Sequence, residues 1–265
     1  MTIRSKQLIA LTLPVALSAM LDNAYRVIDQ HAVQWLGVEA QAAIAACTFI
    51  LIAYYAAYAI ISAGSISLIA KAVGGNREQE QQQLIGNALT GALLLGAMVL
   101  TLSYLFAPAL TQLLGLGENV AKQATAFLHW HAVYCLPQAI MPTVNAIFIA
   151  YGRTRTVLLL QVIATVLNIV LNPICIYQLD YGIGGSAMAT GLSQAVALFI
   201  GLLLLNRSHP FPQPGQSLQA GLKAFHSLLG EPHSLGVGVL DQRDLGMDAF
   251  VGHPLRHAQR VVHGA

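Results

Sequence analysis

Residues 44–70 read IAACTFILIAYYAAYAIISAGSISLIA, a stretch without a single charged side chain. A membrane-spanning helix needs about 20 mostly apolar residues, so this stretch is long enough to cross the hydrocarbon core of a bilayer. Working outward from it, similar apolar stretches are separated by short polar connections. They lie near residues 8–35, 85–107, 123–151, 156–178 and 186–206. The sequence therefore predicts an all-α integral membrane protein built as a bundle of six transmembrane helices.

The composition leads to the same class. Hydrophobic residues make up 56% of the chain and charged residues 9%, whereas ordinary globular domains have about a quarter charged. Such a chain cannot cover a water-facing surface, so we expect the lipid bilayer to surround it. The formal net charge of +2 is too small to indicate a nucleic-acid partner. Neither HExxH nor GxSxG occurs, so we do not expect an enzyme.

Cysteine and histidine do not indicate a metal site or a cofactor. Cys47, Cys135 and Cys175 lie in or beside apolar stretches with no CxxC spacing, which is typical of small buried side chains. His253 and His257 are four residues apart, but nothing else near them completes a ligand set.

The basic residues predict how the helices are oriented. They gather in alternate connections, and the other set of connections offers only Lys122. Because cytoplasmic loops carry an excess of Lys and Arg, we predict a cytoplasmic N-terminus, with both ends of the six-span region on that side. The basic set is Arg4, Lys6, Lys71, Arg77, Arg153, Arg155 and Arg207.

The chain changes character after the sixth predicted span. Residues 207–265 hold six of the nine histidines and five of the ten prolines, and no apolar stretch there is long enough to cross a membrane. We therefore predict a transmembrane lobe at 1–206 and a Pro/Gly/His-rich tail at 207–265 that is disordered, loosely structured or read in a non-native frame.

The first span carries ionisable groups on one face. Asp22 and Arg26 are four residues apart and Arg26 and Asp29 three apart, so both carboxylates are expected to reach the guanidinium. His31 lies about 200° round the helix from Asp29 and is expected to be peripheral. A charge at bilayer depth costs from a few to more than ~10 kcal/mol unless it is paired or hydrated. The charged face must look into protein or into a water-filled cavity.

Two later spans carry polar stripes without charge. Interhelical hydrogen bonding could explain them as packing, and a shared hydrophilic interior could explain them equally well. For Asp29 we favour a functional role, although a salt bridge that merely neutralises Arg26 is the alternative. The stripes are Gln161, Thr165, Asn168 and Asn172 in the fifth span, and Ser186, Thr190 and Gln194 in the sixth.

Four stretches in order resemble the N-terminal half of multidrug and toxic compound extrusion (MATE) transporters, over about residues 8–206. The stretches are LTLPVALSAMLDNAYRVIDQHAVQWLG (11–37), SISLIAKAVGGNREQ (65–79), IAYGRTRTVLLLQVIATVLNIVLNPICIY (149–177) and YGIGGSAMATGLSQA (181–195).

The resemblance implies one six-helix lobe of a twelve-span transporter in the bacterial inner membrane. It implies export of amphipathic or cationic small molecules in exchange for protons or sodium ions, with no bound cofactor. It gives Asp29 the place of the cation site, surrounded by Asn168, Asn172 and Thr190, and it gives Pro14 the place of the proline that kinks the first span. Asp22 and Arg26 are expected to modulate the site as an ion pair. Candidate substrate contacts are Tyr25, Tyr58 and Gln161.

The chain also departs from the family. Asn172 stands where several members have a second acid, and Arg26 stands where the family usually has a neutral residue. A second lobe is absent from this sequence, so a second six-span lobe or a second copy of the chain is the expected partner. Two alternatives stay open. One is a truncated, non-transporting remnant or a half-transporter that needs a partner chain, and the other is a flippase for lipid-linked saccharides.

Overall fold

The computed structural model describes residues 3–208, with side chains described for residues 9–207. The predicted tail at 207–265 lies almost entirely outside the described residues. Within them the chain forms six α-helices, a 3₁₀ turn η1 at Gln34–Leu36 and a π-helical turn η2 at Ile174–Gln178 that extends α5. The helices are α1 (Ile3–Ala32), α2 (Val38–Gly74), α3 (Glu78–Leu113), α4 (Glu118–Ala150), α5 (Thr154–Pro173) and α6 (Gly182–Ser208).

Each of the six predicted spans corresponds to one of these helices. The observed helices are longer than the apolar stretches, and α3 starts with the polar residues 78–83, ahead of the predicted 85–107. The extra turns follow because a helix satisfies its own backbone hydrogen bonds whether its side chains lie in lipid or in water. In the described part of the chain, α2 to α6 (α5 together with η2) are long and apolar enough to cross a membrane. α1 has the length, but it carries Asp22, Arg26 and Asp29.

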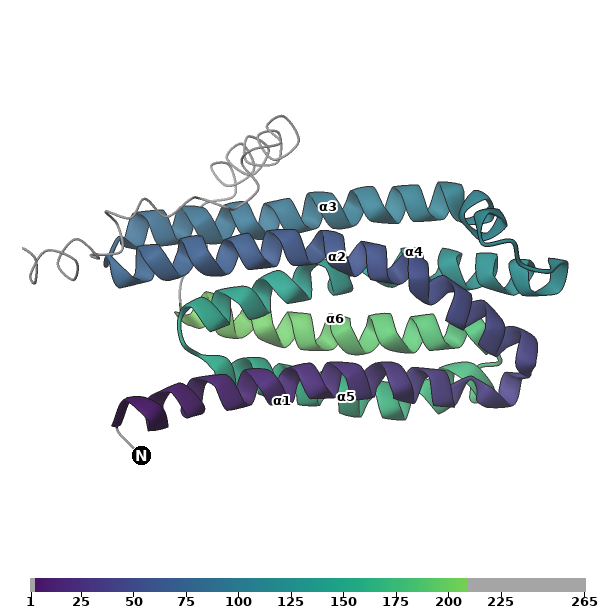
Figure 1. The fold of residues 1–265 in the computed structure, drawn as a ribbon, viewed down its shortest axis with the longest axis horizontal. Helices are drawn as coiled ribbons and strands as arrows, with labels where there is room; N and C mark the ends of the chain where they lie inside the picture. The colour runs from purple at the N-terminus through teal and green to yellow at the C-terminus, as the bar shows by residue number, and fades with distance from the viewer. Residues whose placement is uncertain (1–2, 209–265) are drawn as a thin grey trace, which may run out of the picture. The chain divides into compact units, whose positions relative to one another are not determined.

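Successive helices run up and down the long axis of the bundle. The N-terminus and the α2–α3 and α4–α5 connections lie at one end, and the α1–α2, α3–α4 and α5–α6 connections lie at the other (Figure 1). The basic connections predicted to share one side of the membrane therefore do share one end. Which end faces the cytoplasm stays a prediction.

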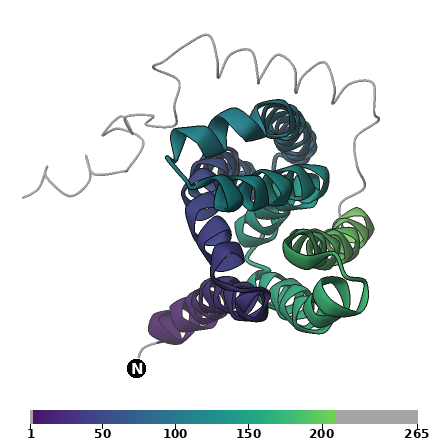
Figure 2. The same cartoon turned by 90° about the vertical axis from the view of Figure 1, so that its right-hand side faces the viewer.

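The bundle is made of two groups of helices. α2, α3 and α4 pack together, α1 packs on α5, and α5 packs on α6, while α4 joins the two groups through its contact with α6 (Figure 2). The largest core cluster includes Val144 and Ile147 of α4, Leu160 of α5 and Leu205 of α6. α1 does not pack along α2, to which residues 33–37 connect it, and this leaves space between the groups for a site.

Small residues bring α6 close to its neighbours. A Cβ added at Gly185 would lie 2.5 Å from the backbone carbonyl oxygen of Cys175, and one at Gly191 would lie 2.1 Å from Cβ of Tyr134. The GGSAMATG stretch therefore allows contacts that a larger side chain would prevent, as expected for helices packing in a membrane. The cysteines Cys47, Cys135 and Cys175 are free and buried, as predicted.

Candidate functional site

The carboxylate of Asp29 is the centre of the polar interior. Nδ2 of Asn168 and Nδ2 of Asn172 donate hydrogen bonds of 2.9 Å and 2.8 Å to its Oδ1. Oγ1 of Thr190 donates one of 2.9 Å to its Oδ2. Asp29 is on α1, the amides are on α5 and the hydroxyl is on α6, so three helices meet at one partly buried carboxylate.

The stripe on α5 explains how the two amides reach the same oxygen. Asn168 and Asn172 are four residues apart, so they stand one turn above each other on the face that packs against α1. Nδ2 of Asn172 also donates to Oδ1 of Asn168 at 3.1 Å, which fixes the orientation of both amides. The structure thus brings together Asp29, Asn168, Asn172 and Thr190, the predicted coupling set.

Tyr25, one helical turn before Asp29 on α1, forms hydrogen bonds to α6. Its side chain is buried, and its hydroxyl donates to the backbone carbonyl of Thr190 at 3.1 Å. A hydrogen bond of 2.8 Å also joins this hydroxyl to Oγ of Ser193. Tyr25 lines the cavity described below, but its polar end is engaged in holding α6.

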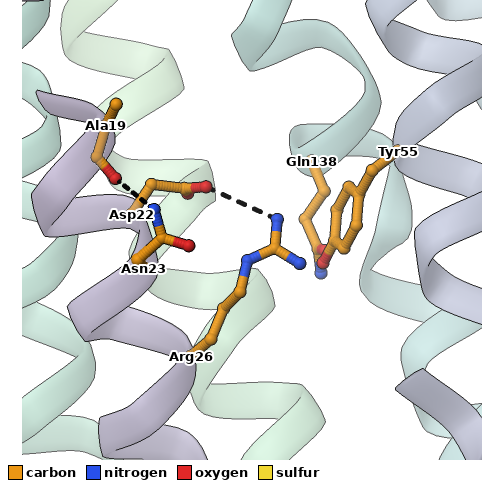
Figure 3. A network of polar contacts seen from close by, with 6 residues as sticks. All are labelled: Ala19, Asp22, Asn23, Arg26, Tyr55 and Gln138. Atoms are coloured by element: carbon orange, nitrogen blue, oxygen red, sulfur yellow. Dashed lines mark hydrogen bonds and ion pairs between the residues drawn. The ribbon is translucent and has the colours of Figure 1, made fainter. Parts of the chain in front are cut away.

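Arg26 forms only one of the two predicted ion pairs. Its guanidinium lies 3.4 Å from Oδ2 of Asp22, as predicted, and 4.5 Å above the centre of the Tyr55 ring on α2 (Figure 3). The predicted pair between Arg26 and Asp29 is wrong, since no basic side chain forms an ion pair with Asp29 among the described residues. Donors from α5 and α6 already occupy the Asp29 oxygens, and the Arg26 side chain extends the other way, across the gap toward α2.

A cavity of about 350 Å³ lies between the two groups of helices. Side chains of α1, α2, α4, α5 and α6 line it, and its wall is predominantly polar where α1 meets α6. The α6 stripe and Gln161 of the α5 stripe therefore face a shared interior, whereas the other members of the α5 stripe are buried and do not line the cavity. Of the predicted site residues, Asp22, Tyr25, Arg26, Asp29, Gln161 and Thr190 line this cavity.

Tyr58 is not a cavity residue, which corrects the prediction that it contacts substrate. It is 2% exposed and packs against Val99 of α3 and Ala139 of α4. The face of α2 that lines the cavity passes instead through Thr48, Leu51, Tyr55, Ala59 and Ser62, spaced three or four residues apart.

Two further predictions on α1 concern Pro14 and His31. α1 continues through Pro14, and Oγ of Ser18 donates to the Pro14 carbonyl at 2.7 Å. Proline removes one backbone donor from the helix, so Pro14 remains the predicted hinge. His31 is exposed, as its place on the helical wheel predicted.

Sequence reasoning missed a second polar cluster on the α2 and α4 side of the cavity. The Tyr55 hydroxyl donates to Oε1 of Gln138 at 2.9 Å, and Nε2 of His131 lies 3.2 Å from the same oxygen. This contact is a hydrogen bond when the His131 ring carries its proton on Nε2, because that oxygen is an acceptor. The spacing of His131, Gln138 and Asn145, seven residues apart each time, was the signal that could have found this cluster.

No group of three or more His, Cys, Asp or Glu side chains suited to a metal ion occurs in residues 3–208. What the cavity does offer is a carboxylate held by neutral donors, one guanidinium and several amides. Such an arrangement is suited to binding a small cation or a polar organic molecule.

Comparison with known proteins places this fold and site in a family. The MatE family model matches residues 14–174. The crystal structure of the Vibrio cholerae MATE transporter VcmN in the bent form superposes with a TM-score of 0.78 at 24% identity, over 85% of this chain and 52% of that chain. At this identity the likeness establishes the fold.

Two curated bacterial relatives match in sequence. The probable multidrug resistance protein YoeA of Bacillus subtilis is 29% identical over 257 residues, which is 91% of this chain and 54% of YoeA. Because 91% is more than residues 1–206 contain, that alignment continues beyond α6. The probable multidrug resistance protein NorM of Bacillus cereus is 22% identical over 152 residues, which is 54% of this chain and 33% of NorM.

The chain thus spans about half the length of YoeA and of the V. cholerae transporter, as a single six-helix lobe would. The family model covers α2 to α5 entirely and most of α1, including the Asp29, Asn168 and Asn172 cluster. The chain therefore belongs to the MatE family and is a multi-pass protein of the bacterial inner membrane.

Proposed function

We propose that this lobe exports amphipathic or cationic small molecules in exchange for a cation, with Asp29 as the site where the cation binds. The observation that carries the proposal is the convergence of Asn168, Asn172 and Thr190 on the Asp29 carboxylate at the wall of a cavity large enough for an organic molecule. An acid at bilayer depth is expensive, and it is held here by neutral donors instead of a salt bridge. Its charge can therefore be removed without leaving a basic partner unpaired.

The two oxygens of Asp29 differ in a way that suits a proton. Oδ1 accepts hydrogen bonds from two amide nitrogens, which can only donate. Oδ2 contacts the Thr190 hydroxyl, which can either donate or accept. A proton on Oδ2 would be donated to Oγ1 of Thr190 once that hydroxyl rotates, while both amide hydrogen bonds to Oδ1 persist. The site can thus take up a proton at the cost of one hydroxyl rotation.

Sodium would require a larger rearrangement. A sodium ion is coordinated by oxygen atoms, and at present both asparagines point their nitrogen atoms at the carboxylate. Oδ1 of Asn172 is buried and has no partner among the described residues, so turning this amide over would present an oxygen but break two hydrogen bonds. We therefore propose the proton as the coupling ion.

Proton uptake would loosen the contacts of α1. As a carboxylate, Asp29 makes three charge-assisted hydrogen bonds to α5 and α6, and such bonds are about twice as strong as those between neutral groups. Neutralising Asp29 weakens all three, which favours a conformation in which α1 bends at Pro14. Arg26 does not have to leave Asp29 in this step, because its ion-pair partner is Asp22.

The lobe works, in this proposal, with a second six-span lobe. Side chains of both α1 and α2 line the cavity, and the chain covers 54% of YoeA. The second lobe would come either from the same longer protein or from a second copy of the chain. In transporters built from two such repeats, the substrate site lies near their interface.

The test measures whether substrate binding releases a proton. The full chain, purified in a weakly buffered detergent solution with a pH indicator, is mixed with ethidium. We expect proton release from the wild type and from Asp22→Asn, and loss of that release in Asp29→Asn. Equal proton release from Asp29→Asn and the wild type would contradict the coupling role. Reconstitution in proteoliposomes then tests transport itself, alone or with a second lobe.

A further inference from the structure

Arg26 is the one Lys or Arg side chain that lines the cavity in the described part of the chain, and its ion pair is weak. Its one ion-pair contact, to Asp22, is long at 3.4 Å, and the two side chains are 45% and 50% exposed. An exposed pair of this kind contributes little to stability and is easily exchanged for another partner. A guanidinium has five N–H donors, and the Asp22 contact engages only one of its nitrogens.

The Arg26 side chain also covers an aromatic ring on the opposite wall of the cavity. Its guanidinium lies 4.5 Å above the Tyr55 ring, which faces the cavity from α2 (Figure 3). An aromatic face at this position would attract an organic cation. Here the protein's own cation already occupies that face, so a substrate cation gains nothing from Tyr55.

Further hydrogen-bond donors surround the same space. Nε2 of Gln138 and Nε2 of Gln161 are buried and have no partner among the described residues, and both side chains line the cavity with Arg26. They approach it from α4 and α5, on either side of the α1 face. Oδ1 of Asn145 is a buried acceptor in the same lining, suited to a donor elsewhere on a bound molecule.

The second acid of the cavity, Asp29, is already engaged by neutral donors of the protein. Both oxygens of Asp29 are already hydrogen bonded to Asn168, Asn172 and Thr190. Besides the carboxylates of Asp22 and Asp29, the cavity lining therefore holds one guanidinium and two unpaired amide donors. An oxyanion suits that set of groups.

We propose that Arg26 determines substrate specificity, and that its guanidinium binds an anionic group, such as a carboxylate, on an amphipathic substrate. The inference rests on the proposed transport function and adds to its substrate class compounds that carry an acidic group, zwitterions included. The substrate's oxyanion binds the free edge of the guanidinium, and Gln138 and Gln161 add donors to it.

The test compares two probes that share a fluorophore and differ in charge. Dansylglycine carries a carboxylate and dansylcadaverine an ammonium group, and binding of each to the full chain in phosphatidylcholine nanodiscs is followed by dansyl fluorescence. We expect the wild type to prefer dansylglycine. Arg26→Gln should weaken dansylglycine binding by about tenfold or more, because a charged hydrogen bond is lost. The same variant should strengthen dansylcadaverine binding, since the Tyr55 ring becomes accessible.

Three further variants separate charge from structure. Arg26→Lys keeps the charge but loses the planar fork, so it should retain part of the dansylglycine affinity. Asp22→Asn removes the competing carboxylate and should raise that affinity. Arg155→Gln removes an exposed charge near the start of α5, outside the cavity lining. It should leave the affinity for both probes unchanged.

The outcomes distinguish the two proposals. If both probes bind and Arg26→Gln leaves their affinity ratio unchanged, the role of Arg26 is overturned while the transport proposal stands. If neither probe nor ethidium binds the wild type, the transport proposal itself fails and this one with it. Loss of dansylglycine binding when phosphatidylglycerol replaces phosphatidylcholine would assign the guanidinium to a lipid headgroup and overturn the proposal.

Discussion

Nδ2 of Asn172 lies 2.8 Å from Oδ1 of Asp29, at the position where the family resemblance places a second acid. One carboxylate and one amide therefore form a hydrogen bond where two carboxylates would repel each other. The pair joins α1 to α5, and it leaves Asp29 as the one acid of this cluster. The first two predictions below test hydrogen bonds of this cluster.

Replacing Asn172 with leucine should destabilise the lobe by about 1–3 kcal/mol, since it removes a donor from a partly buried carboxylate. Unfolding can be followed with a thiol-reactive fluorophore, because Cys47, Cys135 and Cys175 are buried in the folded protein. In an Asp29→Asn background the same replacement should lower the free energy of unfolding by less, because the carboxylate charge of Asp29 is no longer present. Equal costs in the two backgrounds would show that Asn172 acts without Asp29.

Thr190→Val should impair proton release on substrate binding, whereas Thr190→Ser should preserve it. The physical reason is that Oδ2 of Asp29 contacts the Thr190 hydroxyl, which valine lacks and serine keeps. The measurement is the indicator assay with ethidium described above. If the Thr190→Val variant releases protons on substrate binding as the wild type does, the proposal that the proton binds to Oδ2 of Asp29 is wrong.

Gly185→Ala should lower the unfolding temperature, because the added Cβ would lie 2.5 Å from a backbone oxygen of Cys175 that cannot move away without shifting η2. Overpacking of this kind costs about 1–3 kcal/mol. Gly64→Ala on α2 is the matched control, since a Cβ there meets nothing within 4 Å. Both are helical glycines, so helix propensity favours alanine at each site. Equal unfolding temperatures would contradict the close packing of α6.

Tyr55→Leu should alter the binding of dansyl probes, whereas Tyr58→Phe should leave it unchanged. Tyr55 lines the cavity beneath Arg26, and Tyr58 is buried against α3 and α4. Tyr55→Phe serves as an intermediate variant that keeps the ring and removes only the hydrogen bond to Gln138. If Tyr58→Phe changes probe binding more than Tyr55→Leu does, the probes do not bind in the cavity that Tyr55 lines.

The orientation in the membrane can be tested with single added cysteines. Gln79→Cys at the start of α3 and Gly117→Cys just before α4 are both at exposed positions. A membrane-impermeant maleimide applied to intact cells should label position 117 and not position 79, if the N-terminus is cytoplasmic. The native cysteines are buried and give a low background. Labelling of position 79 alone would reverse the predicted orientation.

The positions and polar faces of the helices could be predicted from the sequence. Apolar length located all six helices, because a helix in lipid must satisfy its own backbone groups and bury no charge without a reason. Helical periodicity placed Asp29 on one stripe, Asn168 and Asn172 on a second, and Thr190 on a third. The structure joins these three stripes at one carboxylate.

Which of several possible partners each side chain takes was decided only by the tertiary structure. Spacing along α1 allowed Arg26 to reach Asp22 or Asp29 equally well. The packing of α5 and α6 around Asp29 supplied neutral donors there, and the ring of Tyr55 across the cavity held Arg26 on the other side. In the same way, the choice between Tyr55 and Tyr58 depended on how α2 is rotated against α3 and α4. The periodicity of one helix fixes which residues share a face, but only the neighbouring helices determine what that face meets.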